Sequence, residues 1–189
     1  LAGVLSSRPE KSPASPRVWL GAPNAIKGPT EAVFHRQSGN HMLIVGQRDD
    51  ATTAIMASSL LALCGQINTN ELQLVVIDGN PPGSPERELL EGMYDALPHK
   101  VRSSKDHDIS ALIGEVASEL QRRGEEQTAG ELPPVFVLIN GLQRYKKLRY
   151  DDDLAYSFDA SSQGNNPALQ LNDIICEGAA LGIHLIASI

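Results

Sequence analysis

The sequence is poor in residues that mark several classes of protein. Aromatic residues make up only 4% of the chain, and the two cysteines are Cys64 and Cys176. Both cysteines lie in apolar, helix-like surroundings, so we expect reduced core residues of a cytoplasmic protein, with no disulfide or metal site. No apolar run approaches the roughly 18 residues of a membrane span, and no signal-peptide pattern is present. The core should therefore be aliphatic.

Positive charge is also scarce. The 16 Lys and Arg residues are outnumbered by 23 Asp and Glu residues, which gives a formal net charge of −7. An acidic chain is a poor candidate for covering nucleic acid with its whole surface, although this balance leaves room for a local basic patch. The five histidines show no spacing typical of a metal site, so we expect none.

The length and local composition predict one domain. A chain of 189 residues suits an α/β domain with a sizeable core. Residues 1–16 are rich in Ser and Pro and are interpreted as a linker or flanking segment, which leaves 17–189 as the domain. The chain begins without Met and stops within an apolar run, so we expect a fragment of a longer, multi-domain protein.

Apolar runs alternate with stretches of helical spacing along the chain. The runs predict buried strands at 42–45, 72–78, 134–140 and 183–187, and short strands at 18–20, 32–34 and 99–102. The spacing predicts helices at 54–63, 86–97, 109–123 and 167–179, a short basic helix at 141–150, and a loop at 151–166. We expect Asp106 or Asp108 to cap the third helix, Gly65 to end the first, and Trp19 to anchor its strand. This alternation is typical of a three-layer α/β/α fold with a mostly parallel sheet.

The strand and helix around residue 46 have the outline of a phosphate-binding loop. The pattern G-x-x-x-x-G-K-[ST] follows a buried strand and opens a helix. The corresponding residues here are Gly46, Gln47, Arg48, Asp49, Asp50, Ala51, Thr52 and Thr53. Ala51 replaces the second glycine, and Thr52 replaces the lysine that holds the β- and γ-phosphates. The negative charges of Asp49 and Asp50 would repel a phosphate group. The pattern predicts a degenerate loop that holds ATP and Mg²⁺ weakly or not at all.

An ordinary strand followed by a capped helix explains the same residues. Asp49 or Asp50 would then be the N-cap, and Thr52 and Thr53 would cap the helix without touching a phosphate. Arg48 would pair with a neighbouring acid or face solvent. For the two threonines we favour this second interpretation, and the motif alone leaves both open.

The strand at 134–140 is where a phosphate-loop ATPase would carry its second motif. In such enzymes an acid at the strand end holds Mg²⁺, and in many a following Glu activates water. Here the strand ends in Asn140 and Gly141, so the metal position is neutral and the Glu position has no side chain. Asp78 also ends a strand, but we interpret it as a turn-initiating residue before Gly79. We therefore expect no catalytic residue and no metal ligand.

Two further features have alternative interpretations. One basic cluster consists of Arg144, Lys146, Lys147 and Arg149. It suits contact with nucleic acid, a neighbouring subunit or that subunit's nucleotide, and it equally suits a solvated face that the acids at 151–153 partly neutralise. His184 lies in a predicted buried strand, and we interpret it as a hydrogen-bonded core histidine.

The order of these features resembles the FtsK/SpoIIIE-type motor ATPases. Residues 18–21 (Val-Trp-Leu-Gly) look like their entry strand, and residues 41–46 (His-Met-Leu-Ile-Val-Gly) resemble the strand into their phosphate loop. Residues 182–187 (Gly-Ile-His-Leu-Ile-Ala) are similar to their final strand, although Ser188 stands where the family has Thr. The resemblance covers about residues 17–189. It implies a RecA-like core of ring motors that move DNA or, in type VII secretion systems, proteins.

The resemblance implies one preferred function and two alternatives. Secretion members of the EccC type carry several such domains, some of which have degenerate loops and structural or regulatory roles. We expect this chain to be such a domain, with weak or no ATP hydrolysis. Its expected partners are other ATPase domains of the same chain or ring. The parent protein would bind DNA or a secreted protein, and would meet a membrane only through flanking regions. The alternatives are an active ATP-dependent DNA translocase and a protein-binding module without nucleotide.

Overall fold

The computed structural model describes residues 12–24, 26, 28–105, 108–125, 132–149 and 166–189. Most of the predicted linker, residues 1–11, lies outside this part of the chain. The same holds for residues 150–165, which contain nearly all of the predicted acidic and Ser-rich loop.

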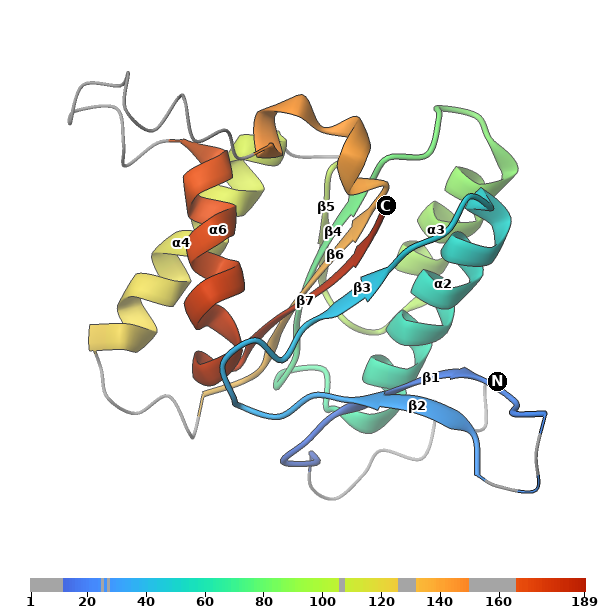
Figure 1. The fold of residues 1–189 in the computed structure, drawn as a ribbon, viewed down its shortest axis with the longest axis horizontal. Helices are drawn as coiled ribbons and strands as arrows, with labels where there is room; N and C mark the ends of the chain where they lie inside the picture. The colour runs from blue at the N-terminus through green and yellow to red at the C-terminus, as the bar shows by residue number, and fades with distance from the viewer. Residues whose placement is uncertain (1–11, 25, 27, 106–107, 126–131, 150–165) are drawn as a thin grey trace.

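A five-stranded parallel sheet forms the centre of the molecule (Figure 1). Its strands, in spatial order, are β3 (Met42–Ile44), β7 (Ile183–Ser188), β6 (Val135–Asn140), β4 (Gln73–Asp78) and β5 (Val101–Ser103). One face is covered by α2 (Asp49–Gln66) and α3 (Pro85–Ala96), and the other by α4 (Ile109–Glu125) and α6 (Pro167–Glu177). A separate antiparallel pair contains β1 (Arg17–Gly21) and β2 (Thr30–Val33). The predicted three-layer α/β/α fold is confirmed.

The core has two halves because the central strands are buried on both faces. Along β4, Leu74 and Val76 pack towards α2 and α3, while Val75 and Ile77 pack into the cluster on the other side of the sheet. Alternate residues of a strand point to opposite faces, so a strand covered on both sides must be apolar throughout. This is the pattern that the apolar runs of the sequence predict.

The strand at residue 42 differs from its prediction. We predicted a buried strand at 42–45, but β3 lies at an edge of the sheet and ends at Ile44. Leu43 is 58% exposed and Val45 is 75% exposed, whereas Met42 and Ile44 pack against the core half that contains α2. An apolar run indicates a strand but does not reveal whether both of its faces are covered.

The ends of the later helices follow local sequence rules. Ser84 caps α3 by accepting a hydrogen bond from the Arg87 amide, and Asn166 caps α6 by accepting one from the Ala168 amide. Asp108 accepts a hydrogen bond from the Ser110 amide, as predicted for the start of α4. These are the short polar side chains that best satisfy the free N–H groups of a first helical turn.

Three local predictions about helices are wrong or shifted. Gly65 does not end α2, which continues to Gln66, and the Ile67 amide closes the last turn on the Leu63 carbonyl. The predicted basic helix at 141–150 consists instead of the 3₁₀ turns η1 (Leu142–Arg144) and η2 (Lys146–Leu148). The helix predicted to reach 179 ends at Glu177 and is followed by the 3₁₀ turn η4 (Gly178–Leu181).

The pair of strands β1 and β2 is anchored by Val18. We predicted this role for Trp19, but Trp19 is 41% exposed and Val18 is fully buried. Successive residues of a strand face opposite sides, so only one of the two can face the core. Val18 packs in the same core half as α2.

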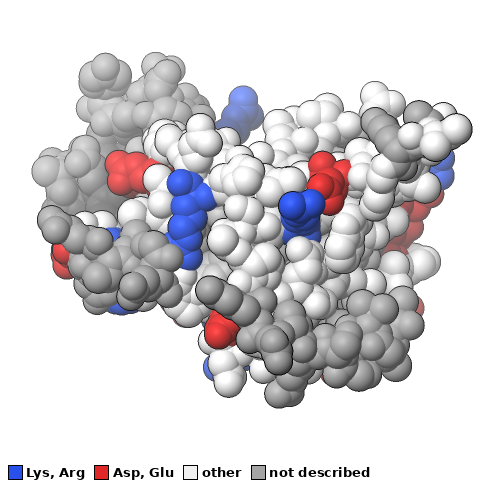
Figure 2. Space-filling model, turned by 90° about the horizontal axis from the view of Figure 1, so that it is seen from below, with Lys and Arg blue, Asp and Glu red and all other residues white. Residues whose placement is uncertain are grey.

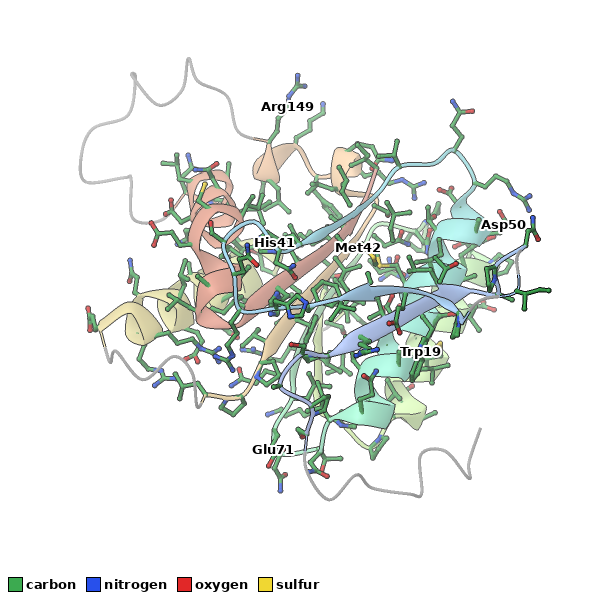
Figure 3. The ribbon with its side chains drawn as sticks, turned by 60° about the horizontal axis from the view of Figure 1, so that its bottom comes forward. Trp19, His41, Met42, Asp50, Glu71 and Arg149 are labelled. Carbon is green, nitrogen blue, oxygen red and sulfur yellow. The ribbon has the colours of Figure 1, made fainter. Side chains whose placement is uncertain are left out.

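Two histidines join β3, β7 and α6. His184 lies in the core beside Phe34 and Phe136, with ring centroids 5.3 and 5.2 Å away, and its Nδ1 donates to the Asn40 carbonyl at 3.0 Å. This confirms the predicted hydrogen-bonded core histidine. His41 Nδ1 accepts from the Leu185 amide at 3.0 Å, so its Nε2 carries the proton that is shared with the Ile175 carbonyl (Figure 3). Burial lowers the pKa of both histidines, to about 4 for His184.

The cysteines differ in environment. Cys64 is buried, and burial raises the pKa of its thiol to about 12, so it is an unreactive core residue as predicted. Cys176 is exposed, which corrects the prediction of a second core cysteine. No helix in the described part of the chain is long and apolar enough to cross a bilayer.

Charged side chains are dispersed on the face shown in Figure 2. The Lys and Arg side chains visible there lie apart from one another, separated by uncharged residues and by Asp and Glu side chains. On this face the described residues therefore form no continuous basic surface.

Candidate functional site

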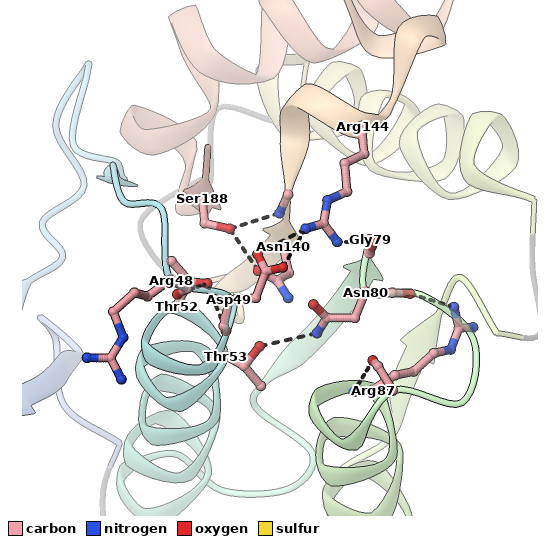
Figure 4. Close-up of polar contacts among 12 residues, drawn as sticks. Arg48, Asp49, Thr52, Thr53, Gly79, Asn80, Arg87, Asn140, Arg144 and Ser188 are labelled. Carbon is pink, nitrogen blue, oxygen red and sulfur yellow. Dashed lines mark hydrogen bonds and ion pairs between the residues drawn. The ribbon is translucent and has the colours of Figure 1, made fainter.

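A polar cluster lies where three parallel strands end beside the start of α2 (Figure 4). Asp78 and Asn140 are register partners at the ends of β4 and β6, and Ser188 ends β7. Ligands of parallel α/β sheets bind outside the carboxyl ends of the strands. This edge is therefore the candidate site, and it contains both predicted motif regions.

The region that resembles a phosphate loop is mostly helical. β3 ends at Ile44 and α2 begins at Asp49, so only residues 46–48 of the eight predicted positions lie outside the helix. In the phosphate-loop pattern, free backbone N–H groups of a glycine-rich loop surround the phosphates. Here residues 49–53 have helical backbone, and the Thr52 amide is already bonded to the Arg48 carbonyl at 3.0 Å. Helical backbone thus begins within the eight predicted positions, at the fourth of them.

The acids at the start of α2 have arginine partners. Arg48 is the N-cap residue, and no side chain caps the helix, so the predicted capping by Asp49 or Asp50 is wrong. Asp50 instead pairs with Arg48 at 2.5 Å, as the alternative for Arg48 anticipated, and this hydrogen bond lowers the pKa of Asp50. Asp49 pairs with Arg144, which follows β6. The Asp50 carboxylate also stays in contact with the first helical turn, because hydrogen bonds from the Ala51 amide and from its own amide lower its pKa as well.

The threonines of the motif do not cap the helix either. The Thr52 hydroxyl donates back to the Asp49 carbonyl at 3.0 Å, within the first turn. The Thr53 hydroxyl is buried and accepts a hydrogen bond from Asn80 Nδ2 at 3.2 Å. Thr53 therefore connects α2 to the loop after β4.

Asn140 is bound on both sides of its amide group. Its Nδ2 donates to Asp78 Oδ1 at 3.1 Å, and its Oδ1 accepts from the Ser188 hydroxyl at 2.8 Å. Ser188 Oγ also accepts from the Gly141 amide at 2.8 Å. The predicted metal position is therefore part of a hydrogen-bond network that crosses three strands.

Asp78 lies at the centre of the site, which sequence reasoning missed. Its Oδ1 accepts from both the Asn80 amide and Asn140 Nδ2, so it does start a turn as predicted but also joins two strands. Its Oδ2 has no hydrogen-bond partner and no exposed surface. The repeated pattern of a polar residue at the end of each strand, including Ser188, was the available signal.

The tyrosines near Asp78 stay protonated at neutral pH. Burial, reinforced by the negative charge of Asp78, raises the pKa of Tyr94, and raises that of Tyr145 to about 12. The described residues also contain no group of three or more His, Cys, Asp or Glu side chains that could hold a metal ion. The site thus offers amides, hydroxyls and one buried carboxylate, without a matched acid and base.

The basic cluster is divided by the fold. Arg144 points into the site, where Nη2 contacts both carboxylate oxygens of Asp49 at 2.8 and 2.9 Å and Nη1 donates to the Gly79 carbonyl at 2.7 Å. Arg149 projects away from the body of the molecule (Figure 3). Only Arg144 of this cluster is positioned to affect the site.

A second concave region lies between α4 and α6, on the opposite side of the sheet from α2. This groove has a volume of about 380 Å³. Its lining combines leucines such as Leu120 and Leu169 with the carboxylates of Asp173 and Glu177. It contains none of the residues of the predicted motifs.

The architecture is that of a RecA-like fold, with the candidate site at the carboxyl edge of the parallel sheet. No protein-family model matches this sequence, and no curated protein matches it. Solved structures do match. The type VII secretion ATPase EccC from Thermomonospora curvata, solved as ATPases 2 and 3 in complex with a signal sequence peptide, has a TM-score of 0.62 and 15% identity. That match covers 97% of this chain and 33% of that chain.

Two further structures support the same architecture. The cytoplasmic domain of the same EccC matches with a TM-score of 0.62 and 18% identity, over 97% of this chain and 22% of that chain. EssC (ATPases 2 and 3) from Geobacillus thermodenitrificans matches with a TM-score of 0.58 and 16% identity, over 96% and 34%. This chain thus spans about a third or less of each of these chains. Its fold is that of type VII secretion ATPase domains.

Proposed function

We propose that this chain is a degenerate ATPase domain of the FtsK/SpoIIIE type, with a structural or regulatory role and little or no ATP hydrolysis. Its setting would be a longer cytoplasmic ATPase similar to those of type VII secretion. The observation that carries this proposal is the state of the two motif regions. α2 starts at Asp49, which is paired with Arg144, and β6 ends in Asn140 and Gly141.

Each change removes a different contribution to phosphoryl transfer. Hydrolysis requires backbone and lysine contacts to the β- and γ-phosphates, an acid for Mg²⁺ and a group that orients water. Thr52 is buried and bonded within its own helix, and the Asn140 amide is bonded to Asp78 and Ser188. Gly141 has no side chain to orient water. Since these three positions lack the lysine, the acid and the Glu, ATP and Mg²⁺ would bind weakly or not at all.

The partners proposed for this domain are other ATPase domains of the same chain or of a ring. In that setting the fold would contribute packing surfaces, while active domains elsewhere supply hydrolysis. One solved structure, that of EccC, is a complex with a signal sequence peptide. The groove between α4 and α6 would offer a secreted segment both apolar and charged lining.

The alternative of an active DNA translocase has less support. The net charge is −7, and the face in Figure 2 has no continuous basic surface. Binding along DNA depends on neutralising several phosphates with Lys and Arg. A protein-binding module that never meets nucleotide remains the second candidate, because the Asn140 amide group is already bonded to Asp78 and Ser188.

The test compares nucleotide binding and hydrolysis in three proteins. They are the natural chain, an Ala51→Gly/Thr52→Lys repair, and an Ala54→Lys control, which adds the same charge at an exposed position of the same helix. Calorimetry with ATP, ADP and Mg²⁺ gives affinity, and phosphate release gives turnover. We expect no turnover from any of them, and binding, if present, only in the repaired chain.

The outcomes separate the candidate functions. ATP turnover by the natural chain above a no-protein background would overturn the proposal in favour of an active motor. Useful nucleotide affinity without turnover would make this a regulatory nucleotide site. Absence of binding even in the repaired chain would favour the protein-binding module. Circular dichroism of each variant establishes that the fold is retained.

A further inference from the structure

The side chain of Arg144 extends across the candidate site. It starts from η1, directly after β6, and reaches both the Gly79 carbonyl after β4 and the Asp49 carboxylate at the start of α2 (Figure 4). A single guanidinium thus joins three segments that are far apart in the sequence. Two of them, the start of α2 and the end of β6, hold the positions at which an active ATPase would bind phosphate and Mg²⁺.

Two glycines leave free the space that the Arg144 side chain occupies. A Cβ atom on Gly79 would lie 3.3 Å from Arg144 Cδ and 2.6 Å from the Asn140 carbonyl oxygen. A Cβ atom on Gly141 would lie 3.2 Å from Arg144 Cδ, and the φ of +73° at Gly141 already disfavours any other residue. The arginine therefore occupies space that these positions keep free of side chains. One of them, Gly141, is the position at which an active relative would carry its catalytic Glu.

The contact to Asp49 places a guanidinium against an anion. Nη2 of Arg144 contacts both oxygens of the carboxylate, while Nη1 is bonded to the Gly79 carbonyl, and arginine is a favoured partner for phosphate as well as for carboxylate. The start of a helix adds positive partial charge. Here the anion comes from the chain itself.

We propose that Asp49 and Arg144 form an internal lock, in which the Asp49 carboxylate fills the anion position that Arg144 and the start of α2 would otherwise present. This inference rests on the proposed function, because it explains why a domain with the ATPase fold would leave nucleotide unbound. The Asp49 carboxylate then occupies the anion position in the folded chain. We therefore expect that removing this carboxylate exposes a binding site for polyphosphate anions.

The lock is weak enough to be tested without unfolding the domain. The Asp49 side chain is 58% exposed and that of Arg144 is 33% exposed. Ion pairs so open to water contribute little to folding stability. Asp49→Asn keeps nearly the same shape while removing the charge, and Asp49→Ser provides a second replacement that is well tolerated at the start of a helix.

The chain contains a matched control for this substitution. Asp50 lies next to Asp49, in the same helical turn, and its side chain has the same exposure of 58%. Asp50 pairs with Arg48 instead of Arg144. Asp50→Asn therefore changes the net charge and the charge at the helix start by the same amount while leaving the lock intact.

The experiment measures binding of inorganic pyrophosphate and tripolyphosphate by calorimetry at low salt. The proteins are the natural chain, Asp49→Asn, Asp49→Ser, Asp50→Asn and the double variant Asp49→Asn/Arg144→Gln. We expect both Asp49 variants to bind at least tenfold more tightly than the natural chain and than Asp50→Asn. The double variant should lose this gain.

Equal gains in Asp49→Asn and Asp50→Asn would overturn the lock, since they would show only a general charge effect. Absence of any gain in folded Asp49 variants, or unfolding of both, would overturn it as well. These results are independent of ATP turnover by the natural chain, which tests the proposed function. A failed lock and a failed function are therefore distinguishable.

Discussion

Replacement of Arg123 should be among the most damaging single changes in this domain. Its side chain is fully buried near the end of α4. Nη2 donates to the Pro133 carbonyl at 2.7 Å, Nη1 donates to the Leu181 carbonyl at 2.9 Å, and Nε donates to Glu119 Oε1 at 2.7 Å. The guanidinium thus fastens α4 to the segments that lead into β6 and β7.

The magnitude follows from the groups that Arg123→Met leaves behind. The Pro133 and Leu181 carbonyls lose a donor, and Glu119 loses one of its two arginine partners. Removing one partner of a buried ion pair costs about 3–5 kcal/mol. In a domain of this size each kcal/mol lowers Tm by about 2–4 °C, so the expected loss is about 6–20 °C.

Urea denaturation and calorimetry measure this loss, and Arg122→Met is the control. Arg122 also pairs with Glu119, at 2.8 Å, but its side chain is 44% exposed. Such a pair contributes roughly 0–1 kcal/mol, so Arg122→Met should change Tm by a few degrees at most. Equal effects of the two substitutions would refute the argument that burial of the Arg123 guanidinium makes it costly to remove.

Three further predictions concern acid, the site and the sheet edge. Burial lowers the pKa of His184 to about 4, so the imidazole binds a proton more tightly in the unfolded chain than in the folded one. The free energy of unfolding should therefore fall as the pH drops from about 6.5 towards 4. In His184→Phe, the urea concentration at the unfolding midpoint should depend less on pH over that window. Thr53→Val leaves buried Asn80 Nδ2 without its acceptor and should cost about 1–3 kcal/mol in urea denaturation, whereas Thr53→Ser should retain most of the stability. Leu43→Lys should change the free energy of unfolding by less than about 0.5 kcal/mol, because Leu43 is exposed, whereas Leu138→Ala in the core should cost about 2–5 kcal/mol. A comparable loss at both sites would contradict the exposed position of Leu43 on β3.

The layered fold was predictable because the evidence for it is local and repeated. The buried strands are mostly apolar runs, and α3, α4 and α6 each have an apolar stripe, so these types followed from periodicity. Polar caps such as Asp108 follow from a single helical turn. The edge position of β3 was not predictable, because Leu43 and Leu138 look alike in sequence and differ only in what covers them.

Some members of the site were predictable, and their contacts were not. The sequence pointed to Thr53 and Asn140, and both lie at the carboxyl edge of the sheet. It did not reveal that Asn140 would be bonded to Ser188, whose position lies 48 residues further along the chain. Capping by Asp49 was a sound local expectation, but Arg144 lies 95 residues away and takes that carboxylate.

The sequence by itself determined the types and order of the elements, the two-sided apolar core and the loss of charged groups at the motif positions. These are properties of single residues and of their local spacing, and neighbouring residues report them directly. The tertiary structure alone decided where α2 begins relative to the motif, which acid meets which arginine, and which faces of β3 are covered. Those outcomes depend on contacts between distant segments, and such contacts exist only once the parallel strands have brought their carboxyl ends together.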